Sequence, residues 1–227
     1  MNGKKNLTPE IIFEDAHLVV LSKPAGLLSQ GERSGDANLV DWLRGHFGRH
    51  YVGLIHRLDR NTSGLMVVAK RSKAARRLTQ ALQEGEIKRW YQAWLCGKLP
   101  GPVRWKHWLH KDEEENQAKV YRAPHPGAKE AVLTAKPVRY AVSKKNVLTL
   151  AEICLETGRS HQIRAQAAFM GLPVLGDTKY GAAPSLAGPA ARPALHSIRL
   201  EFPHPMSGER LCFEEPLPDE MRKVGGR

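Results

Sequence analysis

The sequence contains few cysteines and no close pair of them. Its 227 residues include Cys96, Cys154 and Cys212, which lie far apart and form no C-x-x-C motif. An odd number of widely spaced cysteines argues against a disulfide framework and against a zinc site. We therefore expect three reduced cysteines in the core of a cytosolic protein.

Long hydrophobic runs are also missing. No apolar run approaches the ~20 residues that a membrane-spanning helix needs. The polar residues 1–6 are not followed by the apolar core of a signal peptide. These absences predict a soluble, cytoplasmic protein.

Signals for metals and cofactors are equally scarce. The sequence contains no glycine-rich fingerprint for a nucleotide cofactor. His107 and His110 share a helical spacing, but Trp108 lies between them and no third ligand is evident. A solvated or stacked histidine pair is expected there rather than a metal site. We predict neither a cofactor nor a metal.

Acidic residues are outnumbered by basic ones. The sequence has 23 Asp and Glu against 35 Lys and Arg, a net charge of +12. Such an excess attracts polyanions, and nucleic acid is the usual partner. The basic residues are spread along the chain, as at 70–73 and 76–77, which indicates a charged surface on a folded body. Charge alone does not identify a reaction.

Hydrophobic periodicity predicts an α/β (α+β) fold with a mixed, largely antiparallel sheet flanked by a few helices. The expected strands cover residues 11–13, 17–21, 65–69, 87–96, 131–142, 147–156, 195–202 and 210–213, and the expected helices cover 36–50, 72–85 and 160–170. Ser72 is predicted to cap the second helix and Gly85 to end it. Pro137 is expected at an edge or a bulge of its strand.

The length suits one large domain or two small lobes. We predict a single domain over residues 1–227. Residues 99–129 are polar and include an acidic run, so they are predicted to form a connection or small insertion. Residues 181–193 are rich in Ala, Gly and Pro and are predicted to form a mobile surface loop.

One carboxylate, Asp59, stands between Arg57 and Arg60, ahead of a Thr-Ser-Gly turn that runs into an apolar strand. Neighbouring positive charge holds a carboxylate ionised. An ionised carboxylate at the mouth of a strand, in a basic protein, is a candidate nucleophile. Taken alone, the pattern favours a surface aspartate in an ordinary salt bridge.

A second polar stretch, residues 156–166, leaves a strand, turns at Gly158 and is predicted to open a helix at Ser160. Backbone N–H groups at a helix start, together with Arg159 and Arg164, would bind an anion. That anion would be a phosphate or a carboxylate from elsewhere in the fold. The alternative is that Arg164 is a solvated helix residue and Ser160 only a cap.

The strand predicted at 87–96 carries an aromatic residue beside basic ones. Alternation places Tyr91 on one face with Arg89 and Ala93, and Lys88 on the other face. An aromatic ring near a basic surface can stack on an unpaired base. A strand tyrosine can also be an ordinary core residue.

Residues 56–65 read His-Arg-Leu-Asp-Arg-Asn-Thr-Ser-Gly-Leu and resemble the signature of the RluA family of RNA pseudouridine synthases. Residues 157–164 are similar to the family's Thr-Gly-Arg-x-His-Gln-Ile/Leu-Arg motif. Lys88, Tyr91 and Ala93 match its Lys-x-x-Tyr-x-Ala element. Further matches occur, in the family's order, at 23–27, 171–177, 195–196 and 204–205, so that the resemblance spans about residues 10–216.

The resemblance implies the pseudouridine synthase catalytic fold and an isomerase that converts specific uridines in structured rRNA or tRNA to pseudouridine, without metal or cofactor. It makes Asp59 the essential carboxylate, acting on either the base or the ribose. It pairs Arg164 with Asp59, stacks Tyr91 on a flipped base and places Arg57 in the vacated space. The residues expected to bind RNA are Arg57, Arg60, Lys88 and Arg159.

Family members often carry an N-terminal S4-type RNA-binding domain. Here the match begins after about ten residues, so a chain without that domain is expected. A monomer is also expected, because no apolar interface pattern is evident.

Two other functions compete with the isomerase. A non-catalytic RNA-binding or ribosome-assembly protein would share the basic charge, but the intact set of Asp59, Tyr91 and Arg164 argues against lost catalysis. A metal-dependent nuclease would need clustered carboxylates, which the sequence lacks.

Overall fold

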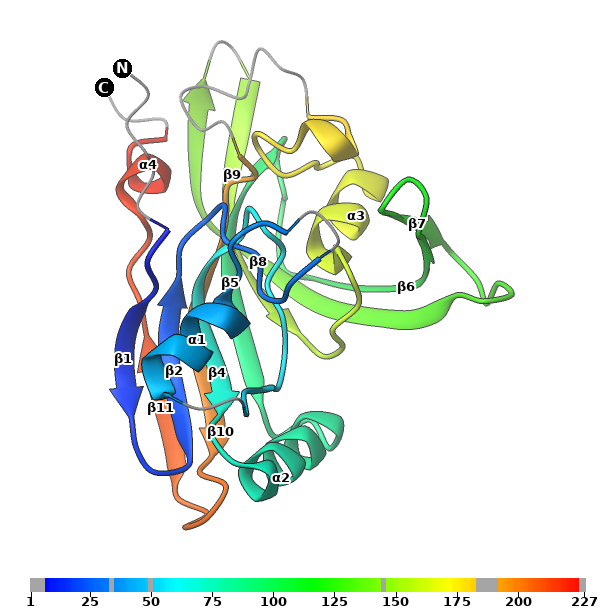
Figure 1. Ribbon diagram of the computed structural model, residues 1–227. Coiled ribbons are helices and arrows are strands. Elements are labelled where there is room, and N and C mark those ends of the chain that lie inside the picture. The colour runs from blue at the N-terminus through cyan, green and yellow to red at the C-terminus, as the bar shows by residue number, and fades with distance from the viewer. Residues whose placement is uncertain (1–6, 33–34, 49–50, 144–145, 183–191, 225–227) are drawn as a thin grey trace. The chain divides into compact units, whose positions relative to one another are not determined.

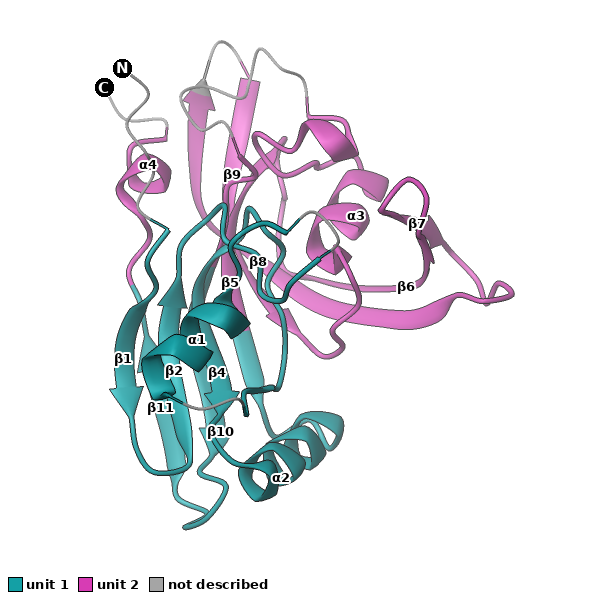
Figure 2. Cartoon of the chain, viewed as in Figure 1, with its two compact units in different colours: residues 1–89, 197–215 teal, residues 90–196, 216–227 magenta. Residues whose placement is uncertain are grey.

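A computed structural model describes residues 7–32, 35–48, 51–143, 146–182 and 192–224 (Figure 1). The chain divides into two compact units, which Figure 2 colours separately. Unit 1 comprises residues 1–89 and 197–215, and unit 2 comprises residues 90–196 and 216–227. No helix in the described ranges has the length and hydropathy needed to cross a membrane.

Unit 1 is built on a sheet with the strand order β1-β2-β4-β10, to which β3 adds at β4 and β11 at β10. Its elements are β1 (Glu10–Glu14), β2 (Leu18–Lys23), α1 (Leu39–Phe47), β3 (Gly53–Leu54), β4 (Ser63–Ala69), α2 (Ser72–Gln83), most of β10 (Leu195–Pro203) and β11 (Arg210–Glu214). The pairings of β2 with β1 and with β4, and of β10 with β11, are antiparallel.

Strand β4 lies at the centre of unit 1, and all seven of its residues are buried. Helix α2 packs Ala74 and Leu78 into the apolar cluster that includes Leu65 and Val67 of this strand. Gly64 has a φ of +111°, and a Cβ there would lie 2.3 Å from the carbonyl oxygen of Ser197. Only glycine fits this position, which explains the Thr-Ser-Gly turn into the strand.

Unit 2 has the strand order β5-β9-β8-β6-β7. Its elements are β5 (Lys88–Cys96, from residue 90 on), β6 (Val103–Asp112), β7 (Gln117–Tyr121), β8 (Lys129–Ser143), β9 (Asn146–Leu155), α3 (Gln162–Phe169), a 3-10 turn (Thr178–Tyr180) and α4 (Asp219–Arg222). All four strand pairings are antiparallel. Helix α3 packs against β6 and β7, with Ala165 beside Leu109 and Ala118 (Figure 1).

The predicted fold class, a largely antiparallel sheet with a few helices, is confirmed. The hairpin of β8 and β9 and the bulge at Pro137 are also confirmed, since the pairing register shifts between Pro137 and Arg139. Residues 99–129, expected to form a polar connection or small insertion, contain the strands β6 and β7, which the sequence analysis did not predict. In β6 the buried Trp105, His107 and Leu109 alternate with outward polar residues, which dominate the composition of the segment.

Several details of the predicted elements also need correction. Ser72 is the first helical residue of α2, whose N-cap is Arg71, and the N-cap of α3 is His161 rather than Ser160. The cysteines are free, as expected, but none is buried, and Cys212 is exposed. Residues 183–191 of the predicted mobile loop lie outside the described residues.

Candidate active site

The Asp59 loop, residues 55–62, precedes β4 and is tied to the turn that follows β2. Lys23 is fully buried, and its Nζ donates hydrogen bonds to the carbonyl oxygens of Pro24 (2.9 Å), Leu27 (2.8 Å) and Arg60 (3.2 Å). The backbone N–H of Gly26 donates to the same Arg60 carbonyl at 2.7 Å. A buried ammonium therefore joins the turn to the backbone directly after Asp59.

The backbone on the other side of Asp59 is held by Ser29. The Ser29 hydroxyl donates to the carbonyl oxygen of Leu58 at 2.7 Å and accepts from the Leu58 N–H at 3.2 Å. The carbonyl of Asp59 itself accepts from the N–H of Thr62 at 3.0 Å. The Asp59 side chain is half-buried. Its position is thus determined by anchors on both neighbours.

The two arginines that flank Asp59 are both exposed but differ in their contacts. Arg60 donates from Nε to the Gly26 carbonyl and from NH1 to Asp36 at 2.9 Å. Its guanidinium therefore serves as a further anchor of the loop, which reduces its availability to RNA. Arg57 has no ion pair within the described residues, and it remains the stronger candidate for contacting RNA.

His56, three residues before Asp59, is a buried neutral side chain. Its Nε2 accepts a hydrogen bond from the backbone N–H of Val67 at 3.3 Å, which leaves the ring proton on Nδ1. Burial, together with the positive charge of Arg89, lowers the pKa of His56 to about 3. The Nδ1 atom is buried and has no hydrogen-bond partner among the described residues.

In unit 2, the buried side chain of Arg164 is held by a bidentate ion pair. Its Nε and NH2 donate to the two carboxylate oxygens of Asp177 at 2.6 and 2.9 Å, and its guanidinium lies 5.1 Å from the ring centre of Tyr180. The interpretation of Arg164 as a solvated helix residue is therefore wrong. The anion that Arg164 binds is a carboxylate of the same chain, that of Asp177.

The turn that carries Arg159 is organised by Gln162. The Gln162 Oε1 accepts from the Arg159 N–H and from the Thr157 hydroxyl, both at 2.9 Å, and its Nε2 donates to the Val132 carbonyl. The backbone groups at this helix start are thereby partly occupied by the protein itself. The Arg159 side chain is exposed, with Nε donating to the Glu130 carbonyl.

Strand β5 shows the predicted alternation. Tyr91 and Arg89 are buried on one face, while Lys88 is exposed. Tyr91 is only 4% exposed, which suits a core residue as well as one that a base would reach after entering the protein. Its role as a stacking residue stays a prediction.

The predicted site residues are distributed over the two units. Arg57, Asp59, Arg60 and Lys88 belong to unit 1, whereas Tyr91, Arg159 and Arg164 belong to unit 2. Asp177 uses two of the three guanidinium nitrogens of Arg164, and the pairing of Arg164 with Asp59 stays a prediction. The supporting residues that the sequence analysis missed are Lys23, Ser29, Gln162 and Asp177. Lys23, Gln162 and Asp177 lie in matched segments, but nothing in the sequence assigned them partners.

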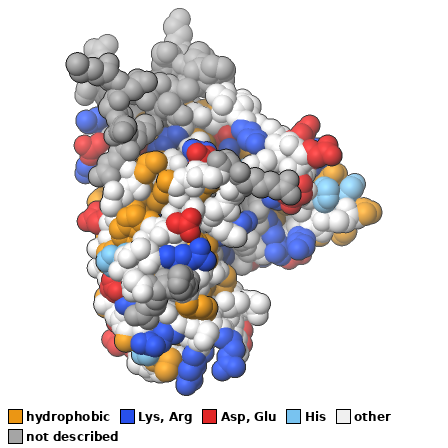
Figure 3. All heavy atoms as spheres, in the orientation of Figure 1, with side chains coloured by type: hydrophobic (Ala, Val, Ile, Leu, Met, Phe, Trp, Pro, Cys, Tyr) orange, Lys and Arg blue, Asp and Glu red, His pale blue; other side chains and the backbone are white. Residues whose placement is uncertain are grey.

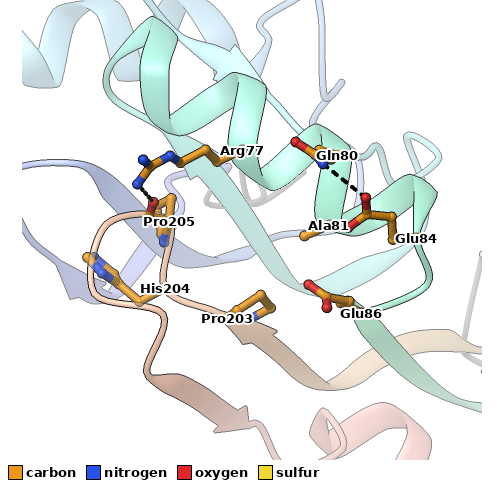
Figure 4. A pocket seen from close by; sticks show the side chains of 8 residues that line it. All are labelled: Arg77, Gln80, Ala81, Glu84, Glu86, Pro203, His204 and Pro205. Carbon is orange, nitrogen blue, oxygen red and sulfur yellow. Dashed lines mark hydrogen bonds between the residues drawn. The ribbon is translucent and has the colours of Figure 1, made fainter.

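A surface groove in unit 1 is lined by none of these residues (Figure 4). It runs between α2 and the residues 203–205, and Arg77 donates to the Pro205 carbonyl at 2.7 Å across it. His204 is occupied by a contact with Asp15 and by the N–H groups of residues 206 and 207. The groove contains none of the predicted site residues. The contacts across it hold the turn at the end of β10 against α2.

Comparison with known proteins gives concordant matches. Residues 17–169 match the family model described as RNA pseudouridylate synthase. The ribosomal large subunit pseudouridine synthase D of Nitrosomonas europaea is 39% identical over 93% of this chain, which spans 63% of that protein's length. The protein of the same name from Vibrio cholerae is 33% identical over 96% of this chain and 70% of its own length. The RNA pseudouridine synthase YhcT of Bacillus subtilis is 34% identical, with 95% and 70% covered.

Two solved structures share the fold. Human RNA Pseudouridylate Synthase Domain Containing 1 superimposes with a TM-score of 0.77 at 21% identity and covers 97% of this chain and 89% of its own. Human RNA Pseudouridylate Synthase Domain Containing 4 gives a TM-score of 0.71 at 24% identity, with 94% and 90% covered. At these identities the similarity establishes the architecture.

Proposed function

Because the chain belongs to the RNA pseudouridylate synthase family, we propose that it converts uridine to pseudouridine in large-subunit ribosomal RNA. The observation that carries this proposal is the Asp59 loop. Asp59, which lies in the segment that resembles the family signature, is half-buried. Hydrogen bonds from Lys23, Ser29 and Gly26 hold the backbone on both sides of it. A carboxylate held this firmly suits chemistry at a fixed position.

The proposed reaction needs a carboxylate but no redox step. The N1–C1′ bond of uridine breaks, C5 bonds to C1′, a proton leaves C5 and N1 gains a proton. Asp59 acts as a nucleophile toward either the ribose or the base, and its charged form is the active one. The proposed pairing of Arg164 with Asp59 would stabilise that charged form.

RNA binding is assigned to exposed basic side chains. Arg57 and Lys88 in unit 1 and Arg159 in unit 2 are exposed. Figure 3 shows Lys and Arg scattered over the visible face rather than gathered in one block. Such contacts would go mainly to phosphates and give salt-sensitive affinity with little sequence content. A uridine in folded RNA must leave its stack to reach Asp59, so base flipping belongs to the proposal.

The test is incubation of purified protein with unmodified transcripts of large-subunit rRNA and of tRNA, followed by mapping of pseudouridine through chemical adducts and primer extension. Wild type should modify specific uridines in the rRNA. Asp59→Asn should modify none and still bind the RNA, because the substitution removes a charge but little volume. Asp219→Asn, which alters an exposed carboxylate of unit 2, should behave as wild type.

Each alternative has its own result in this experiment. Modification of tRNA alone would keep the activity and overturn the rRNA assignment. Tight binding by wild type without pseudouridine on any RNA would favour the non-catalytic RNA-binding protein. Pseudouridine made equally by Asp59→Asn would remove Asp59 from the reaction.

A further inference from the structure

Arg89 is a buried guanidinium that forms no ion pair with any described residue. Arg89 is only 5% exposed. No carboxylate among the described residues lies within ion-pairing distance of it. Its Nε is sealed from solvent and has no hydrogen-bond partner in that part of the chain. Taking a cation out of water costs several kcal/mol unless a partner compensates for it.

The other buried cations of the described chain are all compensated. Lys23 has three carbonyl acceptors, Lys70 has Glu14, Arg164 has Asp177 and Arg192 has Glu220. Among the buried cations of the described residues, Arg89 is therefore the exception. Uncompensated polar groups of this kind concentrate where a protein binds or transforms a ligand.

The positive charge of Arg89 acts on His56, which is held neutral and so provides no negative charge to compensate the guanidinium. Its buried Nδ1 carries a proton and, like Arg89 Nε, has no acceptor. Two N–H donors thus lie in the interior of unit 1 without an acceptor in the part of the chain that the structure describes. A ligand that supplies a negatively charged oxygen would satisfy them.

The place of this pair in the fold indicates which ligand that is. His56 belongs to the Asp59 loop, and Arg89 lies on β5, on the same face of the strand as Tyr91. An RNA phosphate stays at the protein surface, where exposed side chains such as Arg57 and Lys88 can meet it. Because Arg89 is only 5% exposed, a group that enters the protein, such as the flipped base, suits it better as a ligand than a phosphate that stays at the surface.

We infer that Arg89 is a further catalytic residue, whose guanidinium binds a carbonyl oxygen of the flipped uracil and balances the charge that forms on the base during isomerisation. This inference rests on the proposed function. Of the two neighbouring basic residues of β5, Arg89 then serves the reaction and Lys88 is left to contact phosphate.

The chemistry gives the guanidinium a defined task. When the N1–C1′ bond breaks, its electron pair stays on the uracil, which becomes an anion with charge shared by N1 and the ring oxygens. The charge disappears when C5 bonds to C1′, the C5 proton leaves and N1 takes up a proton. A cation already desolvated and aimed at the oxygen stabilises the anion without reorganising water.

The experiment compares Arg89→Met, Arg89→Lys and Arg76→Met, the last removing an exposed charge from α2 as a matched control. The readouts are the single-turnover rate at saturating rRNA, the Kd for RNA and the Tm. For Arg89→Met we expect a rate about 10²–10³-fold lower, a Kd within about threefold, and a Tm equal to or above that of wild type, because an uncompensated buried charge has been removed. Arg89→Lys should retain more activity than Arg89→Met, and Arg76→Met should match wild type.

Two results would overturn the inference. A lowered Tm for Arg89→Met with an unchanged rate would make Arg89 a structural residue. A raised Kd with an unchanged rate at saturation would make it a phosphate contact. If wild type itself forms no pseudouridine on any RNA, the proposed function fails, and that outcome is distinct because it appears before any variant is compared.

Discussion

Arg164 and Arg89 are buried to nearly the same degree, 7% and 5% exposed, yet their surroundings are opposite. Arg164 has both oxygens of Asp177 and the ring of Tyr180 beside it. Arg89 has a neutral histidine and no carboxylate within the described ranges. Burial alone therefore does not distinguish a structural cation from one that binds a ligand. The distinction lies in whether a carboxylate of the protein compensates the charge.

The same contrast separates the supports of the two units. In unit 1 the Asp59 loop is held by side chains that bond to backbone carbonyls, as Lys23 and Ser29 do. In unit 2, α3 is joined to the segment that precedes the 3-10 turn by the charge pair between Arg164 and Asp177. Backbone anchors fix the course of a loop, whereas a charge pair also determines where a cation sits. The two devices should therefore fail in different ways.

Breaking the charge pair should have the largest effect. Asp177→Asn keeps the shape but removes the charge that compensates Arg164. We expect a loss of about 3–5 kcal/mol in the free energy of unfolding, measured by urea denaturation. The double variant Arg164→Met, Asp177→Leu should regain much of that stability without regaining activity. An unchanged free energy of unfolding for Asp177→Asn would show that the pair contributes nothing.

Removing the backbone anchor should cost less stability but should act on the loop directly. Lys23→Met leaves three carbonyl oxygens without their donor, and we expect a loss of about 2–3 kcal/mol. Turnover at saturating RNA should fall because Asp59 is no longer held in place, while the Kd for RNA should change little. A variant that unfolds more easily but turns over normally would separate Lys23 from the active loop.

The buried histidines should make stability depend on pH. The pKa of His56 is about 3 and that of His196 about 4, both below the ordinary value of 6.5, chiefly because of burial. The unfolded chain therefore binds more protons between these values, so the stabilisation is complete above pH 6.5 and is lost as the pH falls toward 3–4. Each histidine contributes a slope of roughly 1.4 kcal/mol per pH unit in that window. Denaturation of His56→Gln at pH 7 and pH 5 should show a smaller difference than wild type, and an equal difference would mean that His56 is protonated in the folded protein.

The smallest effect is expected at the turn of Arg159. Gln162→Ala removes the acceptor of the Arg159 N–H and the Thr157 hydroxyl. We expect about 1–2 kcal/mol of lost stability and a modest rise in the Kd for RNA, measured by filter binding. A stability loss without any change in Kd would remove this turn from the RNA-binding surface.

The strands and motifs could be predicted from the sequence more fully than the side-chain contacts that hold them in place. Alternation and turn residues were sufficient for β1, β2, β4 and the hairpin of β8 and β9. Strand β6 escaped notice because its outward residues are nearly all polar. The partners of Lys23 and Arg164 could not be predicted, since they depend on side chains meeting groups distant in the sequence. Alternation placed Arg89 on the same face as Tyr91, but whether a described residue pairs with it could be seen only in the folded chain.

The most direct test of this account follows the C5 hydrogen, which must leave the uracil if C5 joins C1′. Large-subunit rRNA labelled with [5-³H]uridine is incubated with wild type and with Asp59→Asn, and tritium release and RNA binding are measured in the same samples. Wild type should release tritium, and Asp59→Asn should release none at equal binding of the RNA. Release by Asp59→Asn at the wild-type rate would contradict the proposed role of Asp59.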